Sequence, residues 1–426
     1  MRDIRWFLHP LLSWVLIGAV SILGIILSVR YFTLPFRMDA GSAGKQSRKR
    51  RNTKQSTVGA TLIAVFTAFV VSRVFLCLVY AIAGHLLGLS ATLKADPFSQ
   101  LLRWDAQHYL SLAENWYVAT GDARLHLVFF PLYPLVVRVF HRALGLNVAF
   151  VSIVLSNVFL FLSGWALYRL VEHSFDRDTA ERALRYFMFA PLSFFFSLPF
   201  SESLFFMLCV MCVLMARRRK FPWALLLGAL ASATRLLGLL CAIPVFYEYL
   251  LVVREKKGGV RMAVVSALKC TAIGSGVVGY LALNYAVSGN AFMFLTYQRE
   301  HWSQTFGSLF YTMRYTVEGL FTYTDAMKWT TWGAQILWIV AMIVLIAMAF
   351  RRVSAGDGLY SVMYTYISVA PTWLLSGPRY LTGMYTVYPM IARLTANKIV
   401  DCVLMTLSCM LAGVMLIAYA YFNGVL

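Results

Sequence analysis

Long apolar stretches alternate with short basic stretches along this chain. Residues 11–32, 57–88 and 147–171 are apolar almost throughout, and runs of this length match the roughly 20 residues that a helix needs to cross a bilayer. Backbone groups in hydrocarbon must pair within the protein, and these continuous runs favour helices over the alternating strands of a closed barrel. The pattern therefore predicts an all-α, polytopic transmembrane helical bundle with about 10 to 12 membrane segments.

The composition indicates that lipid is the solvent of this chain. Its 426 residues are 60% hydrophobic and only 13% charged, against roughly 45–50% apolar and about 25% charged residues in soluble domains. The net charge is +20, but the basic residues gather between apolar runs instead of covering one face, which argues against nucleic-acid binding. All seven cysteines lie in or beside apolar segments, so neither a disulfide framework nor a zinc site is predicted.

The basic clusters predict how the segments are oriented. Because Lys and Arg favour cytosolic loops, the regions 33–56, 217–220 and 253–262 are expected in the cytosol, and two sizeable loops, 89–146 and 288–330, in the lumen. The first apolar run resembles a signal anchor more than a cleaved signal peptide, because its basic residues mainly follow it. We divide the chain into an N-terminal apolar segment with a basic linker (1–57) and a transmembrane domain (58–426).

Two regions are too short for their predicted topology. The clusters 217–220 and 254–261 are separated by 33 residues, which extend about 50 Å as a helix, less than two crossings of a core about 30 Å thick. Short or broken helices that turn at Arg235 would solve this, and residues 185–216 would turn likewise at PFSES (199–203). Irregular backbone at membrane depth normally lines a cavity, so we expect a cavity open to the lumenal side.

The first lumenal loop contains the best candidate for a catalytic acid. In LLRWDAQHYLSLAENWY, Asp105 is flanked by Arg103, Trp104 and His108. An amphipathic helix with aromatic residues at the membrane interface is one interpretation. The other is a general base, since a carboxylate at the rim of a cavity is suited to take the proton of a substrate hydroxyl.

Three more charged residues stand in or beside apolar runs. Glu202, Arg235 and Arg379 each occupy such a position, where an unpaired charge costs several kcal/mol. Glu202 could form a structural ion pair with a nearby arginine or help to bind an acceptor. The two arginines could hold a phosphate through paired donors or extend to the lipid headgroups.

The second lumenal loop carries a polar run, TYQREHWSQTFG, that includes Arg299, Glu300 and His301. Metal ligation by Glu300 and His301 is a weak hypothesis, because adjacent residues on a helix do not face one site. A solvated interfacial face is favoured. We predict no metal site and no cofactor.

Six short motifs together resemble one family. They are RWDAQHY, FFPLYP, SNVFLFLSGWALYRL, SLPFSESLF, ATRLLG and SGPRYL, and their order over roughly residues 58–425 is similar to that in the PIG-V family, the second mannosyltransferases of glycosylphosphatidylinositol (GPI) anchor synthesis. Each motif is weak alone, so the resemblance rests on their order. Residues 1–57 depart from the family pattern.

The resemblance implies a GT-C-type glycosyltransferase of the endoplasmic reticulum membrane. It would move mannose from dolichyl phosphate mannose to a mannosyl-glucosaminyl-phosphatidylinositol on the lumenal side, through an α-1,6 linkage and with inversion. Trp104 and Asp105 match the family's Trp-Asp pair, whose acid is the base. The candidate substrate-binding residues are Trp104, His108, Glu202, Arg235, Arg299, His301 and Arg379.

The same resemblance sets the expected partners. These are dolichyl phosphate mannose, the GPI precursor glycolipid, membrane lipid and, optionally, a small membrane partner subunit, with no nucleic acid. Two alternatives remain open: another GT-C enzyme with a different acceptor, and a non-catalytic transporter or assembly subunit. A transporter would be expected to hold its key acids near the bilayer midplane, whereas Asp105 lies in an outer loop, which favours the enzyme.

Overall fold

The computed structural model describes residues 56–422, apart from positions 99, 306, 308, 323–327, 373 and 375. This part of the chain is helical and contains no strand. Its first half comprises α3 (Val58–Leu86), α4 (Ser90–Ala95), α5 (Asp105–Asn115), η1 (Asp122–Val128), α6 (Leu132–Leu144), α7 (Val148–Ser174), α8 (Arg177–Met188), η2 (Ser193–Ser197), α9 (Glu202–Arg217) and α10 (Phe221–Thr234).

The second half continues in the same manner. It comprises η3 (Leu236–Cys241), α11 (Ala242–Glu255), α12 (Val260–Cys270), η4 (Thr271–Gly274), α13 (Ser275–Ser288), α14 (Met293–His301), α15 (Leu309–Thr322), η5 (Lys328–Gly333), α16 (Ala334–Ala349), η6 (Phe350–Arg352), α17 (Ala355–Val369), α18 (Gly377–Thr382), α19 (Val387–Leu394) and α20 (Lys398–Tyr421). The predicted all-α polytopic class is confirmed.

Six described segments are long and apolar enough to cross a membrane. They are Val58–Leu86, Val148–Ser174, Leu236–Glu255, Val260–Ser288, Thr331–Arg352 and Lys398–Tyr421. The first two correspond to the predicted spans 57–88 and 147–171. Helix α10 is apolar but shorter, so the predicted total of about 10 to 12 segments includes elements too short to cross alone. The predicted span 11–32 and residues 33–55 of the predicted cytosolic region 33–56 lie outside the described residues.

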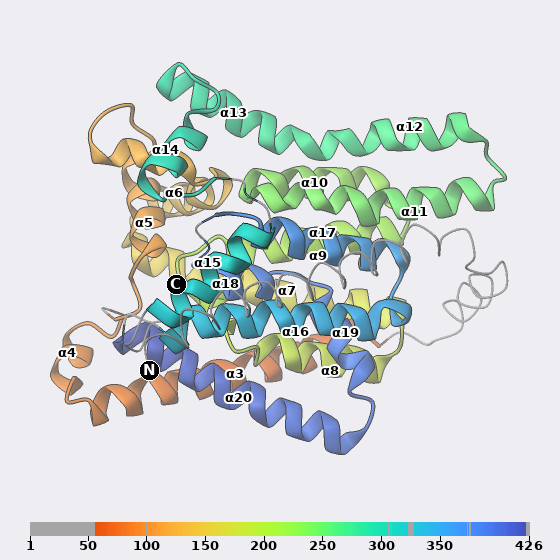
Figure 1. Cartoon of the computed structure of the whole chain (residues 1–426). Helices are drawn as coiled ribbons and strands as arrows, with labels where there is room; N and C mark the ends of the chain where they lie inside the picture. Colours follow the sequence, from red (N-terminus) through yellow and green to blue (C-terminus); the bar gives the residue numbers. More distant parts are fainter. Residues whose placement is uncertain are drawn as a thin grey trace, which may run out of the picture.

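Helix α9 lies at the centre of the bundle. Nearly all of its side chains are buried, and α7, α10 and α11 pack around it. A helix that is apolar on every side must be covered on every side. The outer helices differ: α12 runs along one edge of the molecule and α3 with α20 along the opposite edge (Figure 1), and these three expose large apolar side chains such as Phe66, Leu268 and Met410. Such surfaces suit lipid contact.

The two predicted breaks in the helices are confirmed. Helix α9 begins at Glu202, directly after the irregular residues 198–201 of the PFSES region. Helix α10 ends at Thr234, and Arg235 has an extended backbone (φ −158°, ψ 147°) before the chain enters η3. Close packing stabilises this region: a Cβ atom on Gly276 of α13 would lie 2.1 Å from the carbonyl oxygen of Ala229 in α10. Both breaks therefore occur where a charged residue interrupts an apolar run.

The two predicted lumenal loops lie at one end of the bundle. Helix α14 of the second loop packs against η1 of the first, and the Tyr280 hydroxyl donates a hydrogen bond to the Leu127 carbonyl oxygen at 2.5 Å. Figure 1 shows α5, α6 and α14 at the left and the turn between α11 and α12, within the predicted cytosolic region 253–262, at the right. The fold thus agrees with the relative sidedness predicted from Lys and Arg.

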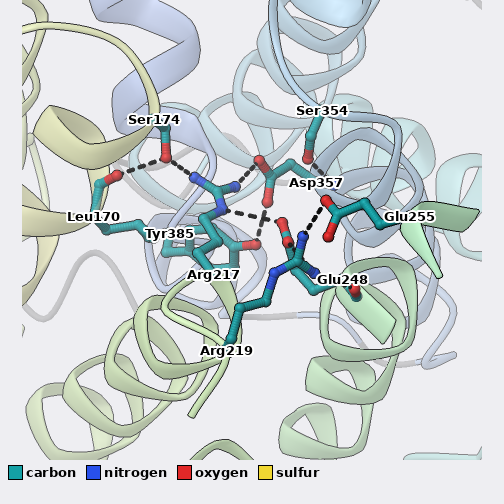
Figure 2. Close-up of polar contacts among 9 residues, drawn as sticks. All are labelled: Leu170, Ser174, Arg217, Arg219, Glu248, Glu255, Ser354, Asp357 and Tyr385. Carbon is teal, nitrogen blue, oxygen red and sulfur yellow. Dashed lines mark hydrogen bonds and ion pairs between the residues drawn. The ribbon is translucent and has the colours of Figure 1, made fainter. Parts of the chain in front are cut away.

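A polar network surrounds the C-terminal end of α9, the end away from Glu202 (Figure 2). Arg217, the last residue of α9, is 7% exposed and donates hydrogen bonds to Ser174 of α7 and Asp357 of α17. The Tyr385 hydroxyl donates to Asp357 Oδ1 at 2.7 Å, and Arg219 donates to the Glu248 carbonyl oxygen in α11 at 2.7 Å. Arg217 of the basic cluster 217–220 therefore joins helices instead of facing water.

The orientation of the bundle can be tested with N-glycosylation tags. We expect a tag inserted at Gly121, between α5 and η1, to be modified because the loop 89–146 is predicted to be lumenal. A tag inserted between Gly258 and Gly259 should stay unmodified, because the region 253–262 is predicted to be cytosolic. Microsomal gel-shift assays with and without endoglycosidase measure both. The reverse pattern would invert the topology.

Candidate functional site

A cavity of about 600 Å³ lies at the end of the bundle that holds the predicted lumenal loops. Its volume falls within the range of roughly 300–1,000 Å³ that is usual for small-molecule sites. The charged, polar and larger aromatic side chains that line it include Trp104, Asp105, Tyr109, Phe129, Arg235, Gln298, His301, Trp302, Ser303, Gln304, Arg379 and Tyr380. Segments far apart in the sequence, from α5 to α18, therefore meet around one space.

Two arginines and two acids form a continuous chain at this cavity. Arg379 Nη2 lies 2.6 Å from Asp105 Oδ2, and Arg379 Nε lies 2.8 Å from Glu202 Oε1. The same oxygen of Glu202 lies 2.7 Å from Arg235 Nη1. With all four groups ionised the positive and negative charges balance, which reduces the cost of burying them.

Aromatic rings surround the two guanidinium groups. The Arg379 guanidinium carbon lies 5.1 Å from the Phe200 ring centroid and 5.4 Å from that of Tyr380. Arg235 lies 5.0 Å from the Tyr380 ring. Faces of aromatic rings attract cations, and the apolar surroundings strengthen the interaction of the arginines with any anion. The site is suited to bind an anion such as a phosphate.

The backbone before α5 fixes the position of Asp105. Trp104 precedes the helix with φ +55°, a left-handed conformation that is uncommon for a bulky residue and costs on the order of 1–3 kcal/mol. One turn further, the Tyr109 hydroxyl donates to Ser201 Oγ at 2.9 Å, which ties α5 to the PFSES break. The strained backbone at Trp104 is thus maintained by the packing of α5, which also places Asp105 next to Arg379.

The two acids differ in their access to the cavity. The side chain of Asp105 is 28% exposed, whereas that of Glu202 is 3% exposed and already contacts two arginines. A group that exchanges a proton with a substrate must reach it. Asp105 therefore has the geometry of a base, and Glu202 that of an anchor for the arginines.

The structure brings together five of the eight candidate site residues at the cavity wall: Trp104, Asp105, Arg235, His301 and Arg379. Glu202 lies behind the arginines and does not line the cavity. It forms the ion pair with a nearby arginine that was one of the two interpretations of this residue.

His108 and Arg299 do not line the cavity. His108 Nδ1 lies 3.2 Å from His126 Nε2, and the His108 ring packs against Phe129. Burial lowers the pKa of His108 below its ordinary value of 6.5, so the ring is neutral at neutral pH. The Arg299 side chain is 65% exposed and lies 3.8 Å from Glu300. A role in substrate binding for either residue stays a prediction.

Four further residues line the cavity without having been predicted as site residues: Tyr109, Gln298, Ser303 and Gln304. The sequence feature that could have indicated Gln298, Ser303 and Gln304 is their position beside His301 in the polar run of the second predicted lumenal loop. Among the described residues, no group of three His, Cys, Asp or Glu side chains is arranged to hold a metal ion.

Most of the residues of this site lie in the part of the chain that is similar to known proteins. The family model described as Mannosyltransferase (PIG-V) matches residues 88–329, which include every candidate site residue except Arg379. A protein named GPI mannosyltransferase 2 from Drosophila pseudoobscura pseudoobscura is 33% identical over 123 residues, 26% of each chain. Its namesake from Drosophila melanogaster is 33% identical over 115 residues, 25% of each chain. These alignments span about a quarter of each relative's length.

Loss of the Glu202 carboxylate is expected to destabilise the fold. In Glu202→Gln, Arg235 and Arg379 would be left close together without their shared anion, and breaking a buried ion pair in this way costs about 3–5 kcal/mol. Glu181→Gln is the matched control, because Glu181 forms an exposed pair with Arg177, and such pairs contribute about 0–1 kcal/mol. Thermal unfolding in detergent measures both, and equal melting temperatures would contradict the anchoring role of Glu202.

Proposed function

This chain belongs to the PIG-V mannosyltransferase family, and on that premise we propose that it transfers mannose from dolichyl phosphate mannose to a GPI precursor. The acceptor would be mannosyl-glucosaminyl-phosphatidylinositol, and the product would carry its second mannose in an α-1,6 linkage. The reaction would take place on the lumenal side of the endoplasmic reticulum membrane. The observation that carries the proposal is a partly exposed acid, Asp105, paired with the buried Arg379 in a cavity that the partly buried Arg235 also lines.

The chemistry needs one base and a site for the leaving anion. Asp105 accepts the proton of the acceptor hydroxyl as its oxygen attacks the anomeric carbon of the mannose. The bond between that carbon and the phosphate oxygen breaks, and its electron pair leaves with dolichyl phosphate. A single displacement converts the β-linked donor into an α-linked product, so no covalent intermediate is required. Arg235 and Arg379 stabilise the charge that develops on the phosphate.

The Asp105–Arg379 ion pair suggests that the donor binds before Asp105 acts on the acceptor. In the protein without substrate, Arg379 Nη2 donates to Asp105 Oδ2 at 2.6 Å, so this oxygen is occupied. A donor phosphate offers Arg379 a second anion. As the guanidinium shifts toward the phosphate, Asp105 Oδ2 is released and becomes available to the acceptor hydroxyl. The base would thus be freed once the donor is bound.

The role of Asp105 is tested by Asp105→Asn. An amide of almost the same shape cannot accept the proton, so mannosyl transfer should fall at least 100-fold, within the ~10²–10⁴-fold range of general-base catalysis. Asp122→Asn, which changes an exposed acid in the same loop, should retain normal transfer. Transfer of radiolabelled mannose in microsomes measures both. Near-normal activity of Asp105→Asn in correctly expressed protein would remove Asp105 from the mechanism.

Phosphate binding is tested by lysine substitution at Arg235 and Arg379. Lysine keeps the charge but cannot hold two phosphate oxygens with a planar fork. Losing one charge-assisted hydrogen bond costs about 1.5–3 kcal/mol, so the KM for the donor should rise roughly tenfold or more for at least one variant. Arg299→Lys serves as the exposed comparison. Unchanged donor KM in both buried variants, with a raised value in Arg299→Lys, would place the phosphate at Arg299.

A further inference from the structure

The residues that line the cavity form two groups of different chemistry. Asp105, Arg235 and Arg379 supply the charges. The end of α14 and the residues after it contribute the side-chain amides of Gln298 and Gln304 together with His301, Trp302 and Ser303. We call this second group, residues 298 and 301–304, the second wall; it carries no acid, lysine or arginine.

The charged residues of the same short run face elsewhere. Arg299 and Glu300 are 65% and 53% exposed, form a pair with each other, and do not line the cavity. In this run the charged side chains of Arg299 and Glu300 are exposed, whereas the amide, hydroxyl, imidazole and aromatic side chains line the cavity.

The second wall is held in a fixed shape. The backbone N–H of Gln304 donates to the backbone carbonyl oxygen of Gln298 at 3.0 Å. Between them, Ser303 has a left-handed backbone with φ +51°. Thr372 fixes the next turn: its backbone N–H donates to the Thr305 carbonyl oxygen at 2.9 Å, and its hydroxyl donates to the Ser303 carbonyl oxygen at 3.2 Å. Trp302 lies edge-on to Phe129, with ring centroids 6.4 Å apart. The lining groups are thus preorganised.

This composition fits a sugar better than a phosphate or a lipid tail. Hexose rings present C–H groups on their faces, which pack on an aromatic ring, and hydroxyl groups at their edges, which pair with amides and with Ser or His side chains. A phosphate prefers cations, and these belong to the other group of lining residues, at Arg235 and Arg379. A hydrocarbon chain would leave several polar groups of the second wall without hydrogen bonds.

Resting on the proposed function, we infer that residues 298 and 301–304 form the acceptor subsite, which binds the oligosaccharide head of the glycolipid and selects it. The acceptor hydroxyl then reaches the reacting centre from the α14 side, and the donor phosphate lies against Arg235 and Arg379. Trp302 provides the stacking face, while Gln298 and Gln304 bind ring hydroxyls. Donor and acceptor recognition thereby reside on separate walls of one cavity.

The test separates acceptor recognition from donor recognition. In microsomes that contain the full chain, Trp302→Ala and Gln298→Ala should raise the KM for a synthetic mannosyl-glucosaminyl-inositol glycolipid about five- to tenfold, the effect of losing roughly 1–1.4 kcal/mol. The KM for dolichyl phosphate mannose should change less than about twofold. Trp302→Phe, which keeps an aromatic face, should recover part of the loss. Trp329→Ala is the matched control, since Trp329 is 67% exposed and outside the cavity.

A second readout excludes a merely structural effect. Trp302→Ala should lower kcat/KM less for a lipid-linked mannoside that lacks the glucosamine than for the complete acceptor. The shorter acceptor makes fewer contacts with the second wall, so it has less binding energy to lose there. Equal losses for both acceptors, or a raised donor KM, would overturn the assignment. Absence of any mannosyl transfer by the unmodified protein would instead refute the proposed function itself, so the two failures are distinguishable.

Discussion

The buried carboxylate of Glu202 is the interaction on which the site depends. Two guanidinium groups that approach the same oxygen at 2.7 and 2.8 Å would repel each other without it. Arg235 comes from the break after α10, Arg379 from α18, and Glu202 from the first turn of α9. One carboxylate therefore fixes three separate segments, and through Arg379 it also fixes Asp105 of α5. Both helix breaks are needed because each brings a charge to this point.

Helix α9 connects this cluster to the network around Arg217. Its 16 residues extend about 24 Å, with Glu202 at one end and Arg217 at the other. In an environment where apolar contact hardly distinguishes protein from lipid, polar and close-packed contacts give helices their specific positions. The Arg217 network joins α9 to α7 and α17, while the Glu202 cluster joins it to α10 and α18. The central helix is thus held at both ends by ion pairs, with apolar packing between them.

The sequence predicted the helical class and the two breaks, because a charge within an apolar run is costly unless structure accommodates it. It also indicated Asp105, Arg235 and Arg379 as candidates, and the structure brings all three to one cavity. The sequence could not predict the pairing, since Arg379 and Asp105 are 274 positions apart and nothing in a periodic pattern relates them. His108 stands three positions after Asp105, yet its contacts with His126 and Phe129 keep it away from the cavity lining, and its role in substrate binding stays a prediction. Neutral residues such as Gln298 gave no signal, because amides are common in any polar loop.

Charge balance also explains why the two arginines of the proposed phosphate site need an acid between them. Transfer of the sugar would turn a phosphodiester into a phosphate monoester, whose charge approaches −2 near neutral pH. Two arginines without carboxylate partners would hold that product strongly, and tight binding of a product slows turnover. Glu202 competes for both guanidinium groups, and Asp105 competes again for Arg379 once its proton has been passed on. The arginines can then stabilise charge that develops during the reaction without keeping the leaving group, because each returns to a carboxylate already within 2.8 Å.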